Sequence, residues 1–276
     1  MKKAVTGYKG TIGSELVDRG YIPIKSDITN IHDLHLELDE KNPDILVHCA
    51  ALTDVDYCEE NDREAFEINV RGTLNVLDCF DGLFVFPSTV HVFSGSTAIH
   101  AYRENQTPSP INSYGLTKFI AEELINGGGA KQSETLIVRA STIYTKEEIL
   151  QIVNKVENGE DVEVTDLIYR SFVYLPHFVD SLESVIQKKV SGNLPEDVIH
   201  IAGNYVESYF GFYNQIARVF DLNNDYIIPR KYKLENEYPR PFKGGLNVDI
   251  ANGYGVKLYS SHDGLEEIKN EYYDRD

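Results

Sequence analysis

The octapeptide Thr6-Gly7-Tyr8-Lys9-Gly10-Thr11-Ile12-Gly13 decides the expected fold of this chain. It follows a short apolar run at 3–6, typical of a buried strand, and it opens a helix-like stretch at 12–18. Glycines at this spacing let the backbone turn tightly and approach a pyrophosphate, which the free amides and dipole of a helix N-terminus attract. Structural turns also use glycine, but the position after the first strand favours dinucleotide binding. The candidate cofactor contacts here are Gly7, Tyr8, Lys9, Gly10, Thr11 and Ile12.

Apolar runs and amphipathic stretches alternate along the first half of the chain. The apolar runs are expected as strands, at 3–6, 21–25, 45–49, 82–87 and 134–139. The stretches between them are expected as helices, at 12–18, 31–41, 64–79 and 113–126. This alternation is typical of βαβ units. The expected fold class is therefore α/β, with a Rossmann-type doubly wound parallel sheet.

From about residue 146 the pattern is less regular and indicates a smaller, partly interleaved α+β lobe. We expect the dinucleotide-binding domain to comprise 1–145 and roughly 166–190, and the smaller lobe to comprise 146–165 and 191–276. A chain of 276 residues is long enough for one main core with a second lobe folded against it.

The chain carries 44 acidic and 26 basic side chains, which gives a formal net charge of −18. This charge repels phosphate backbones and anionic lipid, and no run of Lys or Arg offsets it, so no nucleic-acid or membrane partner is expected. No signal-like apolar stretch follows Lys2 and Lys3, which indicates a cytoplasmic protein. Cys49, Cys58 and Cys79 lack zinc or redox spacing, so we expect reduced thiols and no metal site.

The end of the second predicted strand bears on the choice between NAD and NADP. An acidic residue there binds the ribose hydroxyls of NAD, whereas a basic residue accommodates the 2′-phosphate of NADP. Lys25 stands at the strand end, and Asp27 follows 20 residues after Gly7, the spacing of a ribose-binding acid. Asp27 equally suits a turn or a helix cap. The expected cofactor is NADP(H) or NAD(H), with NADP slightly favoured through Lys25.

A candidate proton-transfer pair lies in the stretch Ser113-Tyr114-Gly115-Leu116-Thr117-Lys118. Tyr114 and Lys118 are four residues apart and so share one face of the predicted helix. A nearby ammonium favours the phenolate and brings the tyrosine pKa closer to neutrality, although exposed helix pairs show the same spacing. Thr89, after the fourth predicted strand, is placed to donate a hydrogen bond to the same carbonyl. His91 is a second acid, a substrate contact or a structural residue.

Together these motifs resemble the extended short-chain dehydrogenase/reductases of the NAD-dependent epimerase/dehydratase type, and among them the dTDP-4-dehydrorhamnose reductases. The resemblance extends over nearly the whole chain. It includes the glycine turn at 6–13, the segments 42–44, 50–56, 68–70, 88–95, 110–122, 138–144 and 200–203, and Arg240-Pro241.

The resemblance implies roles for individual residues. Thr89, Tyr114 and Lys118 match the catalytic hydroxyl, tyrosine and lysine, and Lys118 would also bind the nicotinamide ribose. Arg170 matches an arginine that binds the nucleotide diphosphate, a task that suits its planar, bidentate guanidinium. The loop after the third strand supplies the cofactor contacts Ala50, Ala51 and Thr53, and the implied substrate contacts are Val55, Asp56, Thr89, His91, Thr142, Arg170 and Arg240.

The chain departs from the family pattern around the sugar. Val90-His91 replaces an Asp-Tyr pair, Thr142 stands where the family has a sugar-facing Trp, and Gly244 replaces a Ser. The Asp-Glu pair that a 4,6-dehydratase needs after Thr89 is missing, which argues against that reaction. No cysteine stands at the position expected of an enzyme that also epimerises its substrate.

The expected function is therefore reduction of the keto group of a nucleotide-linked 4-keto-6-deoxy sugar by NAD(P)H, with Tyr114 as proton donor. Two alternatives stay open at this point: a nucleotide-sugar epimerase that retains NAD, and a non-catalytic NAD(P)-binding regulatory subunit. The resemblance also suggests a homodimer.

Overall fold

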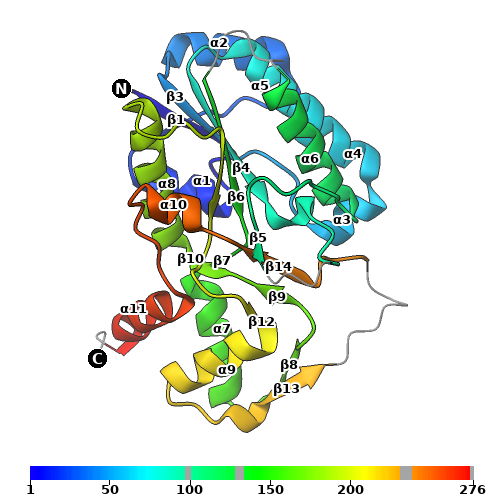
Figure 1. Ribbon diagram of the computed structural model, residues 1–276, viewed down its shortest axis with the longest axis vertical. Coiled ribbons are helices and arrows are strands. Elements are labelled where there is room, and N and C mark those ends of the chain that lie inside the picture. The colour runs from blue at the N-terminus through cyan, green and yellow to red at the C-terminus, as the bar shows by residue number, and fades with distance from the viewer. Residues whose placement is uncertain (97–100, 128–133, 231–237, 274–276) are drawn as a thin grey trace.

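A six-stranded parallel sheet forms the centre of the computed structural model, which describes residues 1–96, 101–127, 134–230 and 238–273 (Figure 1). The strand order is β11-β6-β4-β3-β1-β2. The strands are β1 (Lys3–Thr6), β2 (Ile22–Pro23), β3 (Ile45–His48), β4 (Leu83–Thr89), β6 (Thr135–Ala140) and β11 (Val198–Ile201). The order reverses between β1 and β3, where α/β sheets bind ligands at the carboxyl ends of the strands. The predicted fold class is confirmed.

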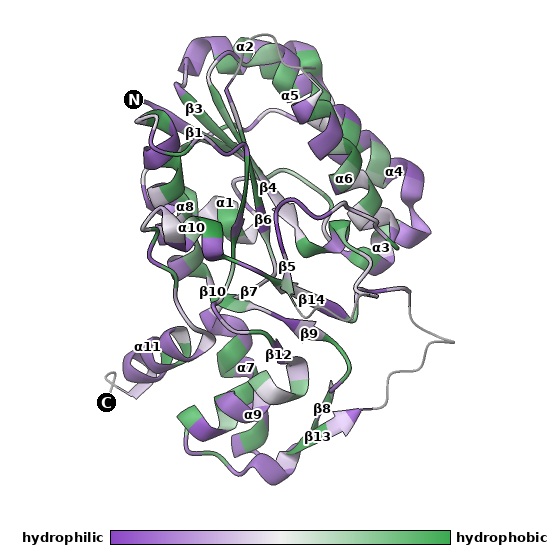
Figure 2. Cartoon of the chain, in the orientation of Figure 1, coloured by the Kyte–Doolittle hydropathy of each residue, from purple (hydrophilic) through white to green (hydrophobic). Residues whose placement is uncertain are grey.

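Helices cover both faces of the sheet, and the alternation of side chains along each strand serves both layers. In β4, Val85 packs into one hydrophobic core, while Phe84 and Phe86 pack into the other. The first core lies under α1 (Thr11–Asp18), α8 (Leu175–Val190) and α10 (Asp249–Gly253), and the second under α2 (Ile31–Lys41), α5 (Thr73–Cys79) and α6 (Ser113–Asn126). Figure 2 shows the hydrophobic central strands between helices whose outer sides are hydrophilic.

Local capping explains why α2 and α6 begin and end as predicted. The side chains of Asn30 and Asn112 accept hydrogen bonds from the amides of Asp33 and Gly115, three residues further on. Asn42 ends α2 in the left-handed conformation, with φ of 45°. These signals are local, so the sequence alone reveals them.

The predicted helix at 64–79 is helical throughout in the structure, but it contains a π-helical turn. After α3 (Val55–Glu60), the chain forms α4 (Asp62–Phe66), a π-helical segment at Glu67–Gly72 and α5 without a break. The Asn69 side chain forms hydrogen bonds outside the helix. Its Oδ1 accepts a hydrogen bond from the Leu52 amide at 2.7 Å, and its Nδ2 donates one to the Thr117 hydroxyl at 3.0 Å. Such π-turns are frequent at functional sites.

The smaller lobe packs three helices around a separate aromatic core. Its helices are α7 (Lys146–Glu157), α9 (Tyr209–Val219) and α11 (Ser261–Tyr273). Its paired strands are β7 (Thr142–Tyr144) with β10 (Phe172–Tyr174), and β8 (Val162–Thr165) with β13 (Ile227–Arg230). A short sheet of β12 (Glu207–Ser208), β9 (Tyr169–Arg170), β14 (Lys243–Leu246) and β5 (Ala101–Tyr102) lies between the two bodies. Single turns of 3₁₀ helix occur at Val90–Val92 and Asn224–Tyr226.

Several segments lie elsewhere than the predicted division places them: β7 and β10 pair in the smaller lobe, and α10 packs on the large sheet. The range 191–276 was expected in the smaller lobe, but β11 forms an edge of the large sheet, where its four residues pair with β6. This pairing joins residues about 60 positions apart in the sequence, and local periodicity carries no information about such a partner. The division into two units otherwise stays a prediction.

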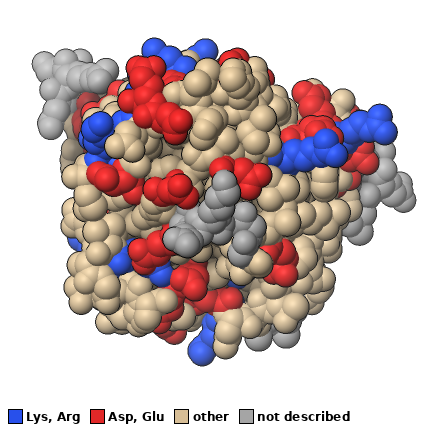
Figure 3. Space-filling view, turned by 90° about the horizontal axis from the view of Figure 1, so that it is seen from above, with Lys and Arg blue, Asp and Glu red and all other residues tan. Residues whose placement is uncertain are grey.

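The charged side chains on one face are shown in Figure 3. Acidic side chains are spread over this face, and Lys and Arg occur in small separate groups. Within the described ranges, each helix is too short or too polar to traverse a lipid bilayer.

Candidate active site

The glycine turn lies between β1 and α1 at the switch point of the sheet. Gly7 has φ of 66°, and a Cβ there would lie 2.5 Å from the Ala50 amide nitrogen. A Cβ on Gly13 would overlap the carbonyl oxygen of Gly7. No side chain caps the N-terminus of α1, so its first amides are left for another acceptor. This turn therefore fits a dinucleotide pyrophosphate.

A groove of about 370 Å³ continues from the turn toward the end of β2. Both candidates for the adenosine ribose line it, Lys25 and Asp27. The Asp27 carboxylate accepts two 2.8 Å hydrogen bonds from the amide and hydroxyl of Thr29, which lower its pKa. Asp27 thus serves a turn, one of its two predicted roles, while the Lys25 side chain is exposed along the groove. The predicted contacts Gly7, Tyr8, Lys9, Gly10, Ala50 and Ala51 line the same groove.

Thr89, Tyr114 and Lys118 line one cavity of about 470 Å³ at the carboxyl ends of the strands. They come from the end of β4 and from successive turns of α6. Tyr114 shares a side-chain hydrogen bond with Thr89. The cavity adjoins the groove, since both are lined by Gly10, Cys49 and Ala51. Other predicted residues along this cavity are Thr11, Ile12, Thr53, Val55, His91 and Thr142.

The electrostatics of the pair differ from the prediction. Burial raises the pKa of Tyr114 to about 12, and the Thr89 hydrogen bond offsets part of that rise. Burial also lowers the pKa of Lys118 to about 7, and its Nζ lies 3.7 Å from the centre of the Phe86 ring. The prediction that the ammonium draws the tyrosine pKa toward neutrality is therefore wrong for this structure, because desolvation dominates both groups. Tyr114 keeps its proton at neutral pH.

A buried ion pair beside the candidate catalytic residues was missed by sequence reasoning. The Glu122 carboxylate accepts hydrogen bonds from Arg139 at 2.6 Å and 3.0 Å and also from the Ser88 hydroxyl. Ser88 precedes Thr89, and Glu122 follows Lys118 by one helical turn, so this network joins β4, α6 and β6. The continued four-residue spacing from Tyr114 through Lys118 to Glu122 was the available signal.

His91 lies against Tyr114, with their ring centres 5.6 Å apart. Asn112 accepts from the Gly115 amide through Oδ1, so its Nδ2 is the donor to His91 Nδ1 at 3.0 Å, which leaves the ring proton on Nε2. Burial and the charges of Arg170 and Arg240 lower the pKa of His91 to about 3. A neutral imidazole is a poor acid, so the predicted role of second acid is wrong near pH 7.

A further cavity of about 600 Å³ adjoins the catalytic one through Val55 and His91. Arg170 is buried at its edge, where Nη1 donates to the carbonyls of Tyr169 and Pro241 at 2.8 Å each. Arg240 pairs with Asp56 at 2.7 Å. The predicted substrate residues Val55, Asp56, His91, Arg170 and Arg240 all line this cavity. Tyr209 and Arg230 line it too, although no sequence motif marks them.

Comparison with known proteins places this arrangement in a family. The sequence model of the family described as the RmlD substrate binding domain matches residues 1–273 of this chain. The chain belongs to this family. Membership confirms the predicted resemblance, and with it the class of NAD(P)-dependent oxidoreductases that act on nucleotide sugars.

Two curated relatives and one solved structure illustrate the similarity. The chain is 25% identical to the spore coat polysaccharide biosynthesis protein SpsK of Bacillus subtilis, over 98% of this chain and 97% of that one. It is 33% identical to the probable low-salt glycan biosynthesis reductase Agl14 of Haloferax volcanii, over 51% of this chain and only 53% of that protein. The structure of dTDP-4-dehydrorhamnose reductase from Bacillus anthracis in complex with NADP superposes with a TM-score of 0.85, at 26% identity, covering 98% and 100% of the two chains.

Proposed function

We propose that this chain reduces the 4-keto group of a nucleotide-linked 6-deoxy sugar with NADPH, and that Tyr114 donates the proton. The observation that carries this proposal is the meeting of Thr89, Tyr114 and Lys118 in one cavity that continues into the groove of the glycine turn. The family membership supports the same reaction class.

The raised pKa of Tyr114 suits a proton donor rather than a base. A bound NADPH would supply hydride to the ketone carbon, and the alkoxide that forms is far more basic than a phenolate. Tyr114 is protonated at neutral pH and can therefore pass its proton to that oxygen. The Thr89 hydroxyl bonds the phenol, so it orients the donor and stabilises the phenolate left behind. Lys118, one turn along α6, is proposed to bind the nicotinamide ribose.

The adjoining cavity supports a nucleotide diphosphate as the part of the substrate that stays attached to the sugar and binds away from the keto group. Arg170 is fixed through Nη1, and among the described residues no partner takes its other guanidinium nitrogens. Burial lowers the pKa of Arg170, because its charge is held away from water. An unmatched buried guanidinium attracts an anion strongly, and two phosphate oxygens match its planar geometry.

Two observations support NADPH over NADH. One oxygen of the Asp27 carboxylate, Oδ1, already accepts both hydrogen bonds from Thr29 and so offers less to a ribose hydroxyl. Lys9 and Lys25 both line the adenosine end of the groove, where ammonium groups attract a 2′-phosphate.

The Tyr114→Phe variant tests the proposed proton donor. We expect kcat with a dTDP-4-keto-6-deoxyhexose to fall about 10²- to 10⁴-fold, the usual contribution of a positioned acid, while NADPH affinity stays within about twofold. Absorbance at the NADPH band measures turnover, and parallel assays with NADH measure cofactor preference. Tyr205→Phe is the matched control, because Tyr205 is 65% exposed and lines neither the groove nor the two cavities described above.

Three outcomes would contradict the proposal. Near-normal turnover in Tyr114→Phe would remove Tyr114 from the reaction. An isomerised sugar without net NADPH consumption by the unaltered protein would identify an epimerase. Binding of NADPH without conversion of any keto sugar would indicate a regulatory protein.

A further inference from the structure

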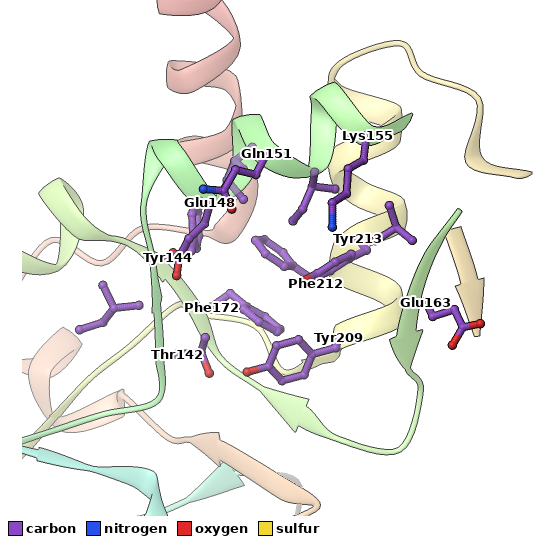
Figure 4. A pocket seen from close by; sticks show the side chains of 14 residues that line it. Thr142, Tyr144, Glu148, Gln151, Lys155, Glu163, Phe172, Tyr209, Phe212 and Tyr213 are labelled. Carbon is purple, nitrogen blue, oxygen red and sulfur yellow. The ribbon is translucent and has the colours of Figure 1, made fainter. Parts of the chain in front are cut away.

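A third cavity, of about 400 Å³, opens from the catalytic site into the smaller lobe between α7 and α9 (Figure 4). It shares Thr142 and Ile143 with the catalytic cavity, and it shares Glu163 and Tyr209 with the arginine-lined cavity. A ligand whose sugar lies beside Tyr114 would therefore be next to this third cavity, at Thr142. The reaction proposed above makes no use of it.

One wall of this cavity is apolar. Phe172 and Phe212 stack in parallel with their ring centres 4.1 Å apart, and Tyr209 meets the Phe172 ring edge-on at 5.0 Å. Aliphatic side chains, among them Ile149 and Ile152 of α7, complete the wall. Hydrocarbon that packs against this wall would be removed from water, which is favourable.

The neck between the two cavities is polar. Figure 4 shows the Tyr209 hydroxyl directed toward Thr142, whose own hydroxyl lies at the same neck. Within the described part of the chain, no hydrogen bond joins either hydroxyl to another group, so both can serve a ligand. At the opposite, solvent-exposed rim stand Gln151 and Lys155.

We propose that this third cavity binds an acyl substituent carried by the sugar of the nucleotide-sugar substrate. The carbonyl of the acyl group accepts hydrogen bonds at the neck from Thr142 and Tyr209, and its hydrocarbon lies on Phe172 and Phe212. The inference rests on the proposed function, since that function places the sugar beside Thr142.

Binding measurements with dTDP-linked 6-deoxyhexosamines test the acyl subsite. The amino group, at C2 or C3, is left free or acylated with two, four or six carbons, and affinity is measured by calorimetry without turnover. Burial of each methylene increases affinity about fourfold, so we expect a steep rise up to the length at which the chain reaches the exposed rim. The Ile152→Trp variant fills the cavity from α7 and should abolish this dependence on chain length.

The matched control is Asn154→Trp, which places the same side chain on the exposed side of the same helix. It should keep the dependence on acyl length. Equal affinities for free and acylated ligands in the unaltered protein would overturn the acyl subsite and leave the reductase proposal intact. An unchanged dependence of affinity on acyl length in Ile152→Trp would have the same consequence. If none of the sugar nucleotides binds, the substrate class of the proposed function is wrong and the subsite falls with it.

Discussion

At the scale of single residues, burial has opposite effects on Tyr114 and Lys118, the proposed catalytic pair. Desolvation disfavours charge, so it keeps Tyr114 neutral and protonated and makes the ammonium of Lys118 easier to deprotonate. The spacing in the sequence predicted the pair, but it could not reveal that both groups are buried against the central sheet, with the Lys118 ammonium over the Phe86 ring. Solvation depends on the whole fold rather than on neighbours in sequence.

The lowered pKa of Lys118 predicts a pH-dependent cost to stability. Between about pH 7 and the ordinary lysine pKa near 10.5, the unfolded chain binds a proton that the folded chain releases. The loss of folding stability that comes from burying the Lys118 ammonium is therefore complete below about pH 7. It disappears as the pH rises toward 10.5. We expect Lys118→Met to raise the melting temperature most at pH 6 and hardly at pH 10.

Thermal unfolding at pH 6, 8 and 10 measures this difference between variant and parent. Lys155→Met provides the comparison, because Lys155 is exposed on α7 and its replacement should give a pH-independent shift. A gain for Lys118→Met that is the same at all three pH values would contradict the assigned cost.

At the scale of secondary-structure elements, the ion pair of Glu122 and Arg139 joins α6 to β6 beneath the catalytic cavity. Both side chains are almost completely buried. In Glu122→Gln the guanidinium loses its counter-charge, and breaking a buried pair in this way costs about 3–5 kcal/mol. We expect the free energy of unfolding in urea to fall by that amount.

The neighbouring exposed Glu123 supplies the control for this experiment. Glu123→Gln changes the same charge on the same helix, and surface substitutions usually alter stability by no more than about 0.5 kcal/mol. Equal stabilities of Glu122→Gln and Glu123→Gln would show that the buried pair contributes nothing net.

The elements that the sequence predicted well are those with local signals. The helices at 31–41 and 113–126 have Asn caps three residues before a bonded amide, and the glycine turn has its own spacing. The helix expected at 64–79 forms, but its π-helical turn was not predicted, because the Asn69 side chain finds partners on Leu52 and Thr117, far away in sequence. The third cavity was missed for the same reason, since its walls come from segments spread between residues 142 and 213.

At the scale of the whole molecule, Gly244 couples the sheet between the two bodies to the position of Arg170. A Cβ at residue 244 would lie 2.5 Å from Arg170 Nη1, and the guanidinium is held by two carbonyls that leave it little room. In Gly244→Ala, Arg170 must shift, and loss of a hydrogen bond to a charged group costs about 1.5–3 kcal/mol. We expect KM for the nucleotide sugar to rise about 10- to 100-fold.

Steady-state kinetics and a separate NADPH titration distinguish this effect from general damage. NADPH affinity should stay within about twofold, because the glycine turn lies in the other body. Gly253→Ala serves as reference, since a Cβ there meets nothing within 4 Å. A KM close to that of the parent would mean that Arg170 does not bind the substrate.

The pairing of β11 with β6 also has a consequence for folding during translation. β6 ends at Ala140 and its partner ends at Ile201, so at 5–20 residues per second the ribosome needs roughly 3–12 seconds to deliver the partner. During that interval the nascent chain exposes a row of unpaired amides and carbonyls along a hydrophobic strand, which is a template for aggregation. We therefore expect correct folding during synthesis to require that the free edge of β6 stays unpaired until translation has passed residue 201. A bound chaperone, or a low concentration of other nascent chains, would keep it so.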